Sequence, residues 1–361
     1  MIRLLKLPYV VFDVIMKQME PSQILFLSLL SVRVKKSIFL SKFKLTGFRL
    51  TCGMNCTDSF IEHWQDPDEK RLEWMGEKRE EDKVVIKWKY VNDLDTLNLL
   101  EEFHISFDRK TGIPTLYFEK WMKKKWPMEL HKYVTNLFRT TSDLELVLNL
   151  SDTTDFNESQ DIKDLYLHRS RTRVSSTLAV ELFEKARIKN SVNVCVQYLE
   201  GSLTDDSKIW NIPNLYIMMN GWVLPRQLSL FNGKNARFVM ADVRGPDLNL
   251  FLKHWLNGKN TELESIGVKG YCGLRAFLGL LGGLFEGVFE GIETRKWDPK
   301  RRQRRYVLKT SFREESNYPF DYLDCAEALD VERSDGLLAS VRIHENFFFM
   351  FVWHKRFSQA L

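Results

Sequence analysis

The stretch Pro246–Gly258 (PDLNLFLKHWLNG) decides the fold, together with the segment Glu262–Ile266 (ELESI) that follows it. Apolar residues recur with helical spacing from Leu248 to Leu256, which predicts a helix. Gly258 then marks a turn, and ELESI has the length and composition of a short strand. The sequence therefore predicts a compact helix–glycine–strand unit in this part of the chain.

An apolar-x-x-apolar-x-apolar pattern recurs around this unit. It is found at Ile162-Leu165-Leu167, at Ile212-Leu215-Ile217 and at Leu263-Ile266-Val268, with spacings of 50 and 51 residues. This spacing is about two units of a leucine-rich repeat of 20–29 residues.

Elements predicted between these copies point to an α/β domain. We expect strands at residues 144–150, 192–198 and 237–243, and helices at 178–186 and 248–256. Short strands that alternate with helices favour a parallel sheet with helices on one side, curved if the repeats stack. The alternative is a non-repeating α/β domain whose strands share hydrophobic spacing by chance.

The C-terminal end is rich in predicted strands. Ser334-Asp335-Gly336 lies between Leu329–Arg333 and the apolar run Phe347–Trp353, and it is typical of a hairpin turn. With the helix–glycine–strand unit, these residues resemble the type 2 F-box-associated domain of nematode F-box proteins. The resemblance spans about residues 200 to 355. It implies a leucine-rich-repeat-like α/β domain with a β-rich end.

The N-terminus has a compact helical pattern. Pro8 suits the first turn of a helix that continues to Met19, and Ser22 is a candidate N-cap for a second helix. The run Ile24–Ser31 is apolar nearly all round. About forty residues bury only part of such a surface among themselves, so some of it should face another surface. That surface belongs either to the rest of the chain or to a partner.

The order of these N-terminal features resembles an F-box. Its elements are Leu7-Pro8, then Ile15 and Met19, then Glu20-Pro21-Ser22, then Leu25, Leu29-Leu30-Ser31 and the basic tail Arg33–Lys36. Val34 stands where the family often has Trp. The resemblance implies a Skp-family adaptor as partner and, through it, a cullin. The adaptor-binding residues it implies are Leu7, Pro8, Val11, Ile15, Met19, Leu25, Leu29 and Leu30. The alternative is a helical hairpin that seals the C-terminal domain.

The predicted organisation is therefore mixed α/β (α+β) in three parts. Residues 1–44 form the all-helical F-box, 45–140 an intervening folded segment that is partly charged, and 141–355 the F-box-associated domain. Within the middle segment, residues 66–83 have mixed charge and predict a solvated loop. Val84–Tyr90 predicts a strand, and Leu94–Phe103 a helix.

Composition restricts the class of protein. The chain has 361 residues, 44% of them apolar and 28% charged, as in ordinary globular proteins. The net charge of +5 is small for a dedicated nucleic-acid binder. Five cysteines do not indicate a disulfide framework, which favours a reducing compartment, cytoplasmic or nuclear. The longest apolar run, Ala276–Phe285, is about half the length of a membrane span, and we expect neither membrane insertion nor a secretion signal.

Sequence motifs for metal binding, phosphate binding or catalysis are weak in this chain. Cys52, Cys56 and His63 suggest zinc, but a structural site usually has four ligands in tighter pairs, so we expect free thiols. The glycines between Gly279 and Gly287 lack the Lys-Ser/Thr of a phosphate loop, and His254 has no partner in a recognised motif. We expect no cofactor, no small-molecule substrate and no catalytic activity.

A basic cluster extends from Arg295 to Arg305. It contains seven Lys or Arg residues, and only Asp298 opposes them within the segment. One interpretation is a nuclear-import or polyanion-binding patch. The other is a solvated hairpin loop between the strands Val288–Trp297 and Tyr306–Thr310.

The sequence thus predicts a non-catalytic substrate receptor of a Skp–cullin–F-box ubiquitin ligase, whose C-terminal domain binds an unknown target protein. The alternative is a scaffold or nucleic-acid-associated module that uses the solenoid face and the basic cluster.

Overall fold

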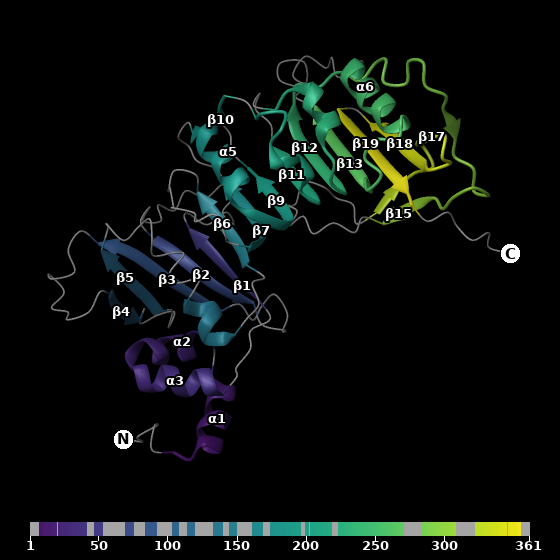
Figure 1. Cartoon of the computed structure of the whole chain (residues 1–361). Coiled ribbons are helices and arrows are strands. Elements are labelled where there is room, and N and C mark those ends of the chain that lie inside the picture. The colour runs from purple at the N-terminus through teal and green to yellow at the C-terminus, as the bar shows by residue number, and fades with distance from the viewer. Residues whose placement is uncertain are drawn as a thin grey trace. The chain divides into compact units, whose positions relative to one another are not determined.

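A computed structural model shows a mixed α/β protein with helices at the N-terminus (Figure 1). It describes residues 7–19, 21–41, 47–52, 69–75, 84–91, 103–107, 114–119, 133–139, 144–149, 161–168, 174–195, 199–201, 203–218, 223–270, 284–307, 322–344 and 346–354. The chain divides into two compact units. Unit 1 contains Met1–His168 and Lys185–Arg187, and unit 2 contains Arg169–Glu184 and Ile188–Leu361. The three-part division predicted from the sequence remains a prediction.

Unit 1 begins with three helices, α1 (Tyr9–Gln18), α2 (Pro21–Leu30) and α3 (Val32–Leu40). Pro8 precedes α1, and its carbonyl accepts the Phe12 amide at 3.0 Å. The prediction that Ser22 caps the second helix is wrong, because α2 already begins at Pro21. A proline at a helix start needs no partner for an amide, so Pro21 itself sets the boundary. Ser31 is the residue that caps a helix here, through its hydroxyl and the Val34 amide of α3.

The sheet of unit 1 has the order β7-β6-β1-β2-β3-β5-β4. Its strands are β1 (Gly47–Cys52), β2 (Glu69–Met75), β3 (Val84–Val91), β4 (Phe103–Phe107), β5 (Pro114–Glu119), β6 (Leu144–Asn149) and β7 (Asp161–His168). The pairs β1–β6, β6–β7 and β3–β5 are parallel, and β1–β2, β2–β3 and β4–β5 are antiparallel.

Of the predictions for the middle segment, one is wrong in part and another falls mostly outside the described residues. The charged segment 66–83 is not wholly a loop, because residues 69–75 form β2 between β1 and β3. Leu72 and Trp74 alternate with charged residues there, and this period of two is that of a strand despite the charge. The helix predicted at 94–103 lies outside the described residues except for Phe103, which begins β4. The strand predicted at Val84–Tyr90 is confirmed as β3.

Unit 2 contains a run of parallel strands in chain order. They are β9 (Arg187–Val194), β11 (Asn214–Met218), β12 (Asn235–Ala241) and β13 (Ser265–Gly270), and each pairs in parallel with the next. Helix α5 (Ser176–Lys185), the 3-10 helices η5 (Lys208–Asn211) and η6 (Pro225–Leu230), and α6 (Gly245–Leu256) lie before or between them. The strand predicted at 192–198 begins earlier than expected, at Arg187, because its first four residues (RIKN) include three polar ones and none of the four is buried.

The helix–glycine–strand unit is confirmed. Helix α6 ends at Leu256, Gly258 follows with φ +84°, and β13 begins at Ser265. A left-handed residue just after a helix is most easily glycine, because it has no Cβ. The predicted apolar triplets lie in or just before β7, β11 and β13, and all nine of their side chains are buried. That these strands are copies of one leucine-rich-type repeat remains a prediction.

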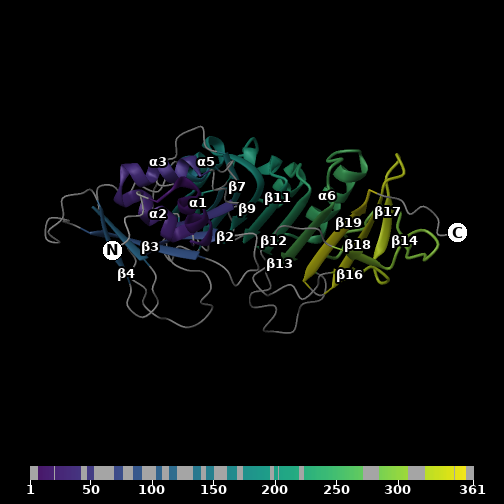
Figure 2. The ribbon, with the colours of Figure 1, turned by 90° about the horizontal axis from the view of Figure 1, so that it is seen from below.

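Antiparallel strands complete the sheet of unit 2. Strand β13 is followed in the sheet by β19 (Phe347–Trp353), β18 (Leu338–His344), β17 (Leu329–Glu332) and β14 (Arg295–Lys296) (Figures 1 and 2). Two short pairs lie outside it, β8 (Val174–Ser175) with β10 (Leu199–Glu200), and β15 (Arg305–Val307) with β16 (Tyr322–Asp324). The predicted turn at Ser334–Gly336 is confirmed, since it joins β17 to β18 with Gly336 at φ +82°.

The apolar core of unit 2 lies between α6 and one face of this sheet. Leu248, Phe251, Leu252 and Trp255 of α6 are buried, as are Phe238 and Phe348 of the strands. Complete burial of one such large side chain contributes about 1.5–3 kcal/mol. Gly245 at the start of α6 permits a close approach, because a Cβ there would lie 1.7 Å from the Glu286 carbonyl oxygen. The sheet is therefore covered on one face by a tightly docked helix.

Candidate functional site

Helix α1 has an exposed aliphatic side. Val10, Val11 and Val14 are 72%, 43% and 55% exposed, whereas Phe12 and Met16 on its other side are buried. Tyr9, at the start of the helix, donates its hydroxyl to the Leu40 carbonyl at the end of α3 (2.9 Å). The helix is thus held by one side and presents valines on the other. An exposed aliphatic stripe of this kind is typical of a protein–protein contact.

The predicted adaptor-binding residues divide by burial. Pro8 and Val11 are exposed, and four others are half-buried: Leu7, Ile15, Met19 and Leu29. Leu25 is 0% exposed, so it belongs to the interior of the helical region rather than to an accessible face. The α2 pattern is apolar all round, and such a pattern does not reveal which side is buried. The side chain of Leu30 lies outside the described residues.

The structure adds exposed apolar residues that sequence reasoning missed. They are Val10, Val14, Val32, Phe39 and Leu40. Val10 and Val14 are four residues apart in α1, a spacing that puts them on one side of the helix. This spacing was visible in the sequence, but the exposed and buried sides of α1 are both apolar. Only the packing of Phe12 and Met16 distinguishes them.

A short helix at residues 133–138 contacts α2 and α3. Tyr133 donates its hydroxyl to Ser28 Oγ (3.0 Å), and the Lys35 ammonium lies 4.0 Å from the Tyr133 ring centroid. The guanidinium carbon of Arg139 likewise lies over an aromatic ring, 4.1 Å from the centroid of Phe39. Burial raises the pKa of Tyr133, so its hydroxyl remains a donor at neutral pH. The N-terminal helices are therefore fixed to a segment about a hundred residues further along the chain.

The basic cluster is not the hairpin loop that the sequence suggested. Strand β14 pairs with β17, and β15 pairs with β16, so the two do not form a hairpin with each other. The strand predicted at Val288–Trp297 is also shorter, because Gly287 and Gly291 adopt positive φ of +82° and +68° within a series of turns. Only Arg295–Lys296 of that range forms strand. For the second predicted strand, Arg305–Val307 form β15, and residues 308–310 lie outside the described residues.

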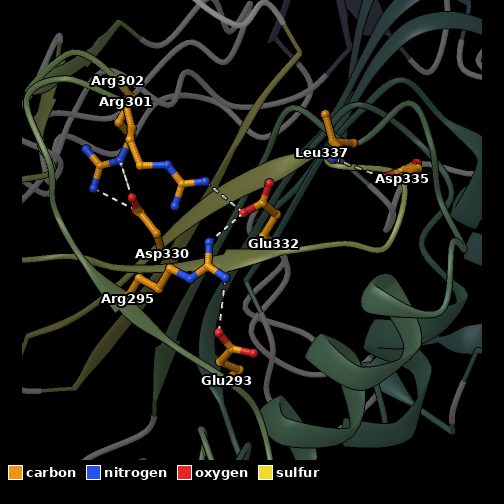
Figure 3. A network of polar contacts seen from close by, with 8 residues as sticks. All are labelled: Glu293, Arg295, Arg301, Arg302, Asp330, Glu332, Asp335 and Leu337. Carbon is orange, nitrogen blue, oxygen red and sulfur yellow. Dashed lines mark hydrogen bonds and ion pairs between the residues drawn. The ribbon is translucent and has the colours of Figure 1, made fainter.

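Ion pairs with carboxylates are formed by Arg295, Arg301, Arg302 and Arg304, and Figure 3 shows those of the first three. Arg295 and Arg301 both bind Glu332 Oε2, at 3.0 and 2.9 Å, and Arg304 binds Asp324. The Arg304 guanidinium lowers the pKa of Asp324, and an amide hydrogen bond from Ala326 adds to this. These pairs neutralise part of the charge, which weakens the interpretation of the cluster as a polyanion-binding patch.

Arg302 is buried, unlike its neighbours. Its Nε lies 2.9 and 2.8 Å from the two Asp330 carboxylate oxygens, and its Nη2 donates to the Cys325 carbonyl at 3.1 Å. Ser340 donates to the same carboxylate, and Trp353 Nε1 donates to Ser340 Oγ, both at 2.8 Å. A buried ion pair is tolerated only where hydrogen bonds satisfy its remaining groups. This network joins the basic segment to β17, β18 and β19.

The other candidate residues from the sequence form no site in the part of the chain that the structure describes. Cys52 lies in β1 without a described side chain, and Cys56 and His63 lie outside the described residues. Of the glycines between Gly279 and Gly287, only Gly287 is described, in a turn next to the buried Phe285 and Val288. His254 is half-buried on α6. Within the described ranges, no group of three His, Cys, Asp or Glu side chains could hold a metal ion. No helix among the described segments has the length and apolar character to cross a membrane.

Comparisons with known proteins bear on unit 2. Residues 207–268, from the start of η5 into β13, match the family described as F-box associated. Two uncharacterized proteins of Caenorhabditis elegans are similar to the chain. One is 24% identical over 243 residues, which cover 64% of this chain and 51% of that protein. The other is 21% identical over 201 residues, which cover 54% and 41%. The chain spans about half the length of these curated relatives. No solved structure matches it.

Proposed function

We propose that the chain is the substrate-recognition subunit of a Skp–cullin–F-box ubiquitin ligase. Helices α1–α3 would form the F-box and dock a Skp-family adaptor, which in turn binds the cullin. Unit 2 would bind the target protein. The observation that carries the proposal is the F-box-associated match at residues 207–268 in a chain that begins with three helices and an exposed valine stripe.

The valine stripe of α1 supports the adaptor part of the proposal. Val10, Val11 and Val14 are exposed in the free chain, and a partner that covered them would remove their apolar surface from water. Apolar contacts of this kind are characteristic of stable interfaces. Each valine would contribute up to about 1.5–3 kcal/mol if it became fully buried.

The proposed role is non-catalytic. A receptor of this kind contributes proximity, because it holds the lysines of the target near an activated ubiquitin and so raises their effective concentration. The contacts of Tyr133 and Arg139 with α2 and α3 would help here, since they fix the adaptor-binding helices to a later part of unit 1.

In the alternative, the chain is a nucleic-acid-associated module that binds through the basic cluster, and the state of its arginines bears on this. Arg302 is buried, and Arg295, Arg301 and Arg304 are paired with carboxylates. A salt-titrated binding assay with random RNA or DNA separates the two proposals. Strong binding with a steep salt slope, lost on neutralisation of residues 301–305, would support the alternative.

The adaptor part is tested by co-purification of a Skp-family adaptor with the full chain. Two sets of substitutions are used: Leu7→Ala and Pro8→Ala with Ile15→Asp, and Val11→Asp with Val14→Asp. A buried carboxylate without a partner is costly, so each set should abolish co-purification. Point substitutions are preferable to deletion of residues 1–40, because that deletion would uncover the helix at 133–138.

Leu250→Asp is the matched control. Leu250 is 56% exposed on α6 of unit 2, so the change introduces one carboxylate on an aliphatic residue about as exposed as Val14, which is 55% exposed. This variant should retain the adaptor. Retention of the adaptor by both N-terminal sets would refute the assignment.

A further inference from the structure

Three buried side-chain atoms in the part of the chain that the structure describes have no hydrogen-bond partner. They are Trp255 Nε1, Arg333 Nη1 and Asn260 Oδ1. Two of the three are donors that lie together, because the guanidinium carbon of Arg333 lies over the Trp255 ring, 5.2 Å from its centroid. Asn260 has different neighbours, since its amide nitrogen donates to the carbonyls of Phe231 and Gly233 after η6. Buried polar groups are nearly always paired with a protein group or an ordered water, so the two adjacent donors indicate an acceptor between them.

The first donor is fixed by the packing of α6. Trp255 is 2% exposed and lies in the last turn of the helix. Its large apolar ring favours burial, but the indole N–H is buried with the ring and loses its contact with bulk water. The same turn offers carbonyl oxygens, because the last four carbonyls of a helix lack intrahelical partners. The end of α6 therefore presents both a buried donor and acceptors.

The second donor is fixed by the turn between β17 and β18. The Arg333 amide donates to the Leu337 carbonyl at 2.9 Å, and Arg333 Nε and Nη2 bind the Asp335 carboxylate. The Leu337 amide donates to the same carboxylate at 3.0 Å (Figure 3). The Arg333 side chain is 4% exposed. The ion pair uses one side of the guanidinium group, and the two N–H groups of Nη1 remain for another acceptor.

The charges around the two donors favour a neutral acceptor over an anion. Asp335 already balances the charge of Arg333, and its hydrogen bond from Arg333 lowers the pKa of Asp335 to about 2. The carboxylate is therefore ionised at neutral pH. The C-terminal end of a helix also has a partial negative charge, which opposes an anion beside Trp255. Water is a neutral acceptor, and it can donate its own hydrogens to carbonyl oxygens.

We propose that one ordered water binds between α6 and the β17–β18 turn, where it accepts from Trp255 Nε1 and Arg333 Nη1. An oxygen at about 2.9 Å from each of two nitrogens joins atoms up to about 6 Å apart, which is on the scale of the contact between ring and guanidinium group. Internal waters make about three hydrogen bonds, and a carbonyl of the last turn of α6 accepts the third. The water thus joins the helix to the turn, in addition to the cation–π contact. The site is independent of the ligase role, because it uses no residue of α1–α3.

The test is a crystal structure of the full chain, at a resolution that shows ordered waters and with bromide in place of chloride. A water should lie at about 2.7–3.2 Å from both nitrogens, with no anomalous signal of bromide at its position. A bromide peak there would overturn the proposal in favour of an anion site. A protein group in hydrogen-bonding contact with both nitrogens would overturn it too, as would the absence of density between them.

The indole N–H of Trp255 reports the same water in solution. In ¹⁵N-labelled protein, its proton should show a nuclear Overhauser effect to the water signal, with the sign of a long-lived internal water. The chain has ten tryptophans, so the variant Trp255→Phe is needed to assign this proton. It removes the N–H and keeps an aromatic ring. An Overhauser effect with the sign of freely exchanging bulk water would count against the site.

Arg333→Met tests whether the second donor holds the water. Methionine keeps an apolar stem beside the ring but has no N–H, so the Overhauser effect at Trp255 should be lost. Asp335→Asn is the matched control, because it alters the other side of the guanidinium group and leaves both donors in place, and here the effect should remain. Backbone amide spectra that match the unaltered chain away from the substituted turn exclude misfolding. An effect that persists in Arg333→Met would show a water bound by Trp255 alone and would overturn the shared site.

Discussion

Arg301 and Arg302 are adjacent in the sequence and bind carboxylates two residues apart on β17, yet their environments differ. The Arg301 side chain is 39% exposed and its partner Glu332 is 24% exposed. The Arg302 side chain is 1% exposed and its partner Asp330 is 4% exposed. Figure 3 shows the two pairs side by side on the same strand. The same residue types therefore form a surface ion pair and a buried one within one segment.

This difference in exposure determines how much each ion pair contributes to the stability of the folded protein. An exposed pair is screened by water and contributes about 0–1 kcal/mol. A buried pair has a large desolvation cost that offsets its attraction, but loss of one partner leaves an uncompensated charge in the interior. Arg302 also covers Trp353, so the buried pair holds the basic segment against β19. The charge of this segment has a structural use at one position and is solvated at the next.

The largest effect is expected for Arg302→Ala. Asp330 would remain buried without its cation, which should destabilise the protein by about 3–5 kcal/mol. A lower urea midpoint, followed by tryptophan fluorescence, would show this. The double variant Arg302→Met with Asp330→Leu removes both charges and should recover much of the lost stability. A midpoint as low in the double variant as in Arg302→Ala would mean that packing on Trp353, rather than charge, is what matters.

The positions of several elements could be predicted from the sequence because their signals are local. The α6 pattern with Gly258, the turn at Ser334–Gly336 and the run that forms β3 all have such signals. Strand β2 was missed because mixed charge obscured its alternation, and only its partners β1 and β3 stabilise it as a strand.

Burial within charged or apolar runs could not be predicted in the same way. Nothing in the segment Arg301–Arg305 distinguishes Arg302, because its partner lies 28 residues away on β17. The same holds for Leu25, which belongs to a helix that is apolar on every side. The exposure of Val10, Val11 and Val14 on α1 likewise depends on which side of the helix packs against the protein.

A smaller loss is expected for Ser340→Ala. Ser340 links the buried pair to Trp353, because it donates to Asp330 and accepts from Trp353 Nε1. Its removal leaves the indole N–H without this acceptor, at a cost of about 1–3 kcal/mol. The urea midpoint should fall less than in Arg302→Ala. Ser340→Cys is a control of similar shape with a weaker acceptor and should lie between Ser340→Ala and the unaltered chain.

A pH dependence should follow from Cys325, whose carbonyl accepts from Arg302. Burial raises the pKa of its thiol from 9.0 to about 11. The folded state therefore retains a proton that the unfolded state loses above pH 9, so stability should fall as the pH rises from about 9 to about 11. Below pH 9 the effect should vanish. The urea midpoint of Cys325→Ala should depend less on pH over this interval, and equal slopes in both proteins would contradict the prediction.

The smallest effect is expected for Arg301→Ala, the neighbour of the buried residue. Arg295 binds the same oxygen of Glu332, so the carboxylate retains a cation when Arg301 is lost. The cost should be below about 1 kcal/mol and should disappear at high salt, because salt screens exposed charges. Urea midpoints at low and high ionic strength measure this directly. The midpoint of Arg302→Ala should stay low at both salt concentrations, since ions do not reach the buried pair. If salt also restored the stability of Arg302→Ala, the two pairs would be alike in solution, and the ion pair of Arg302 would not be what holds the segment over Trp353.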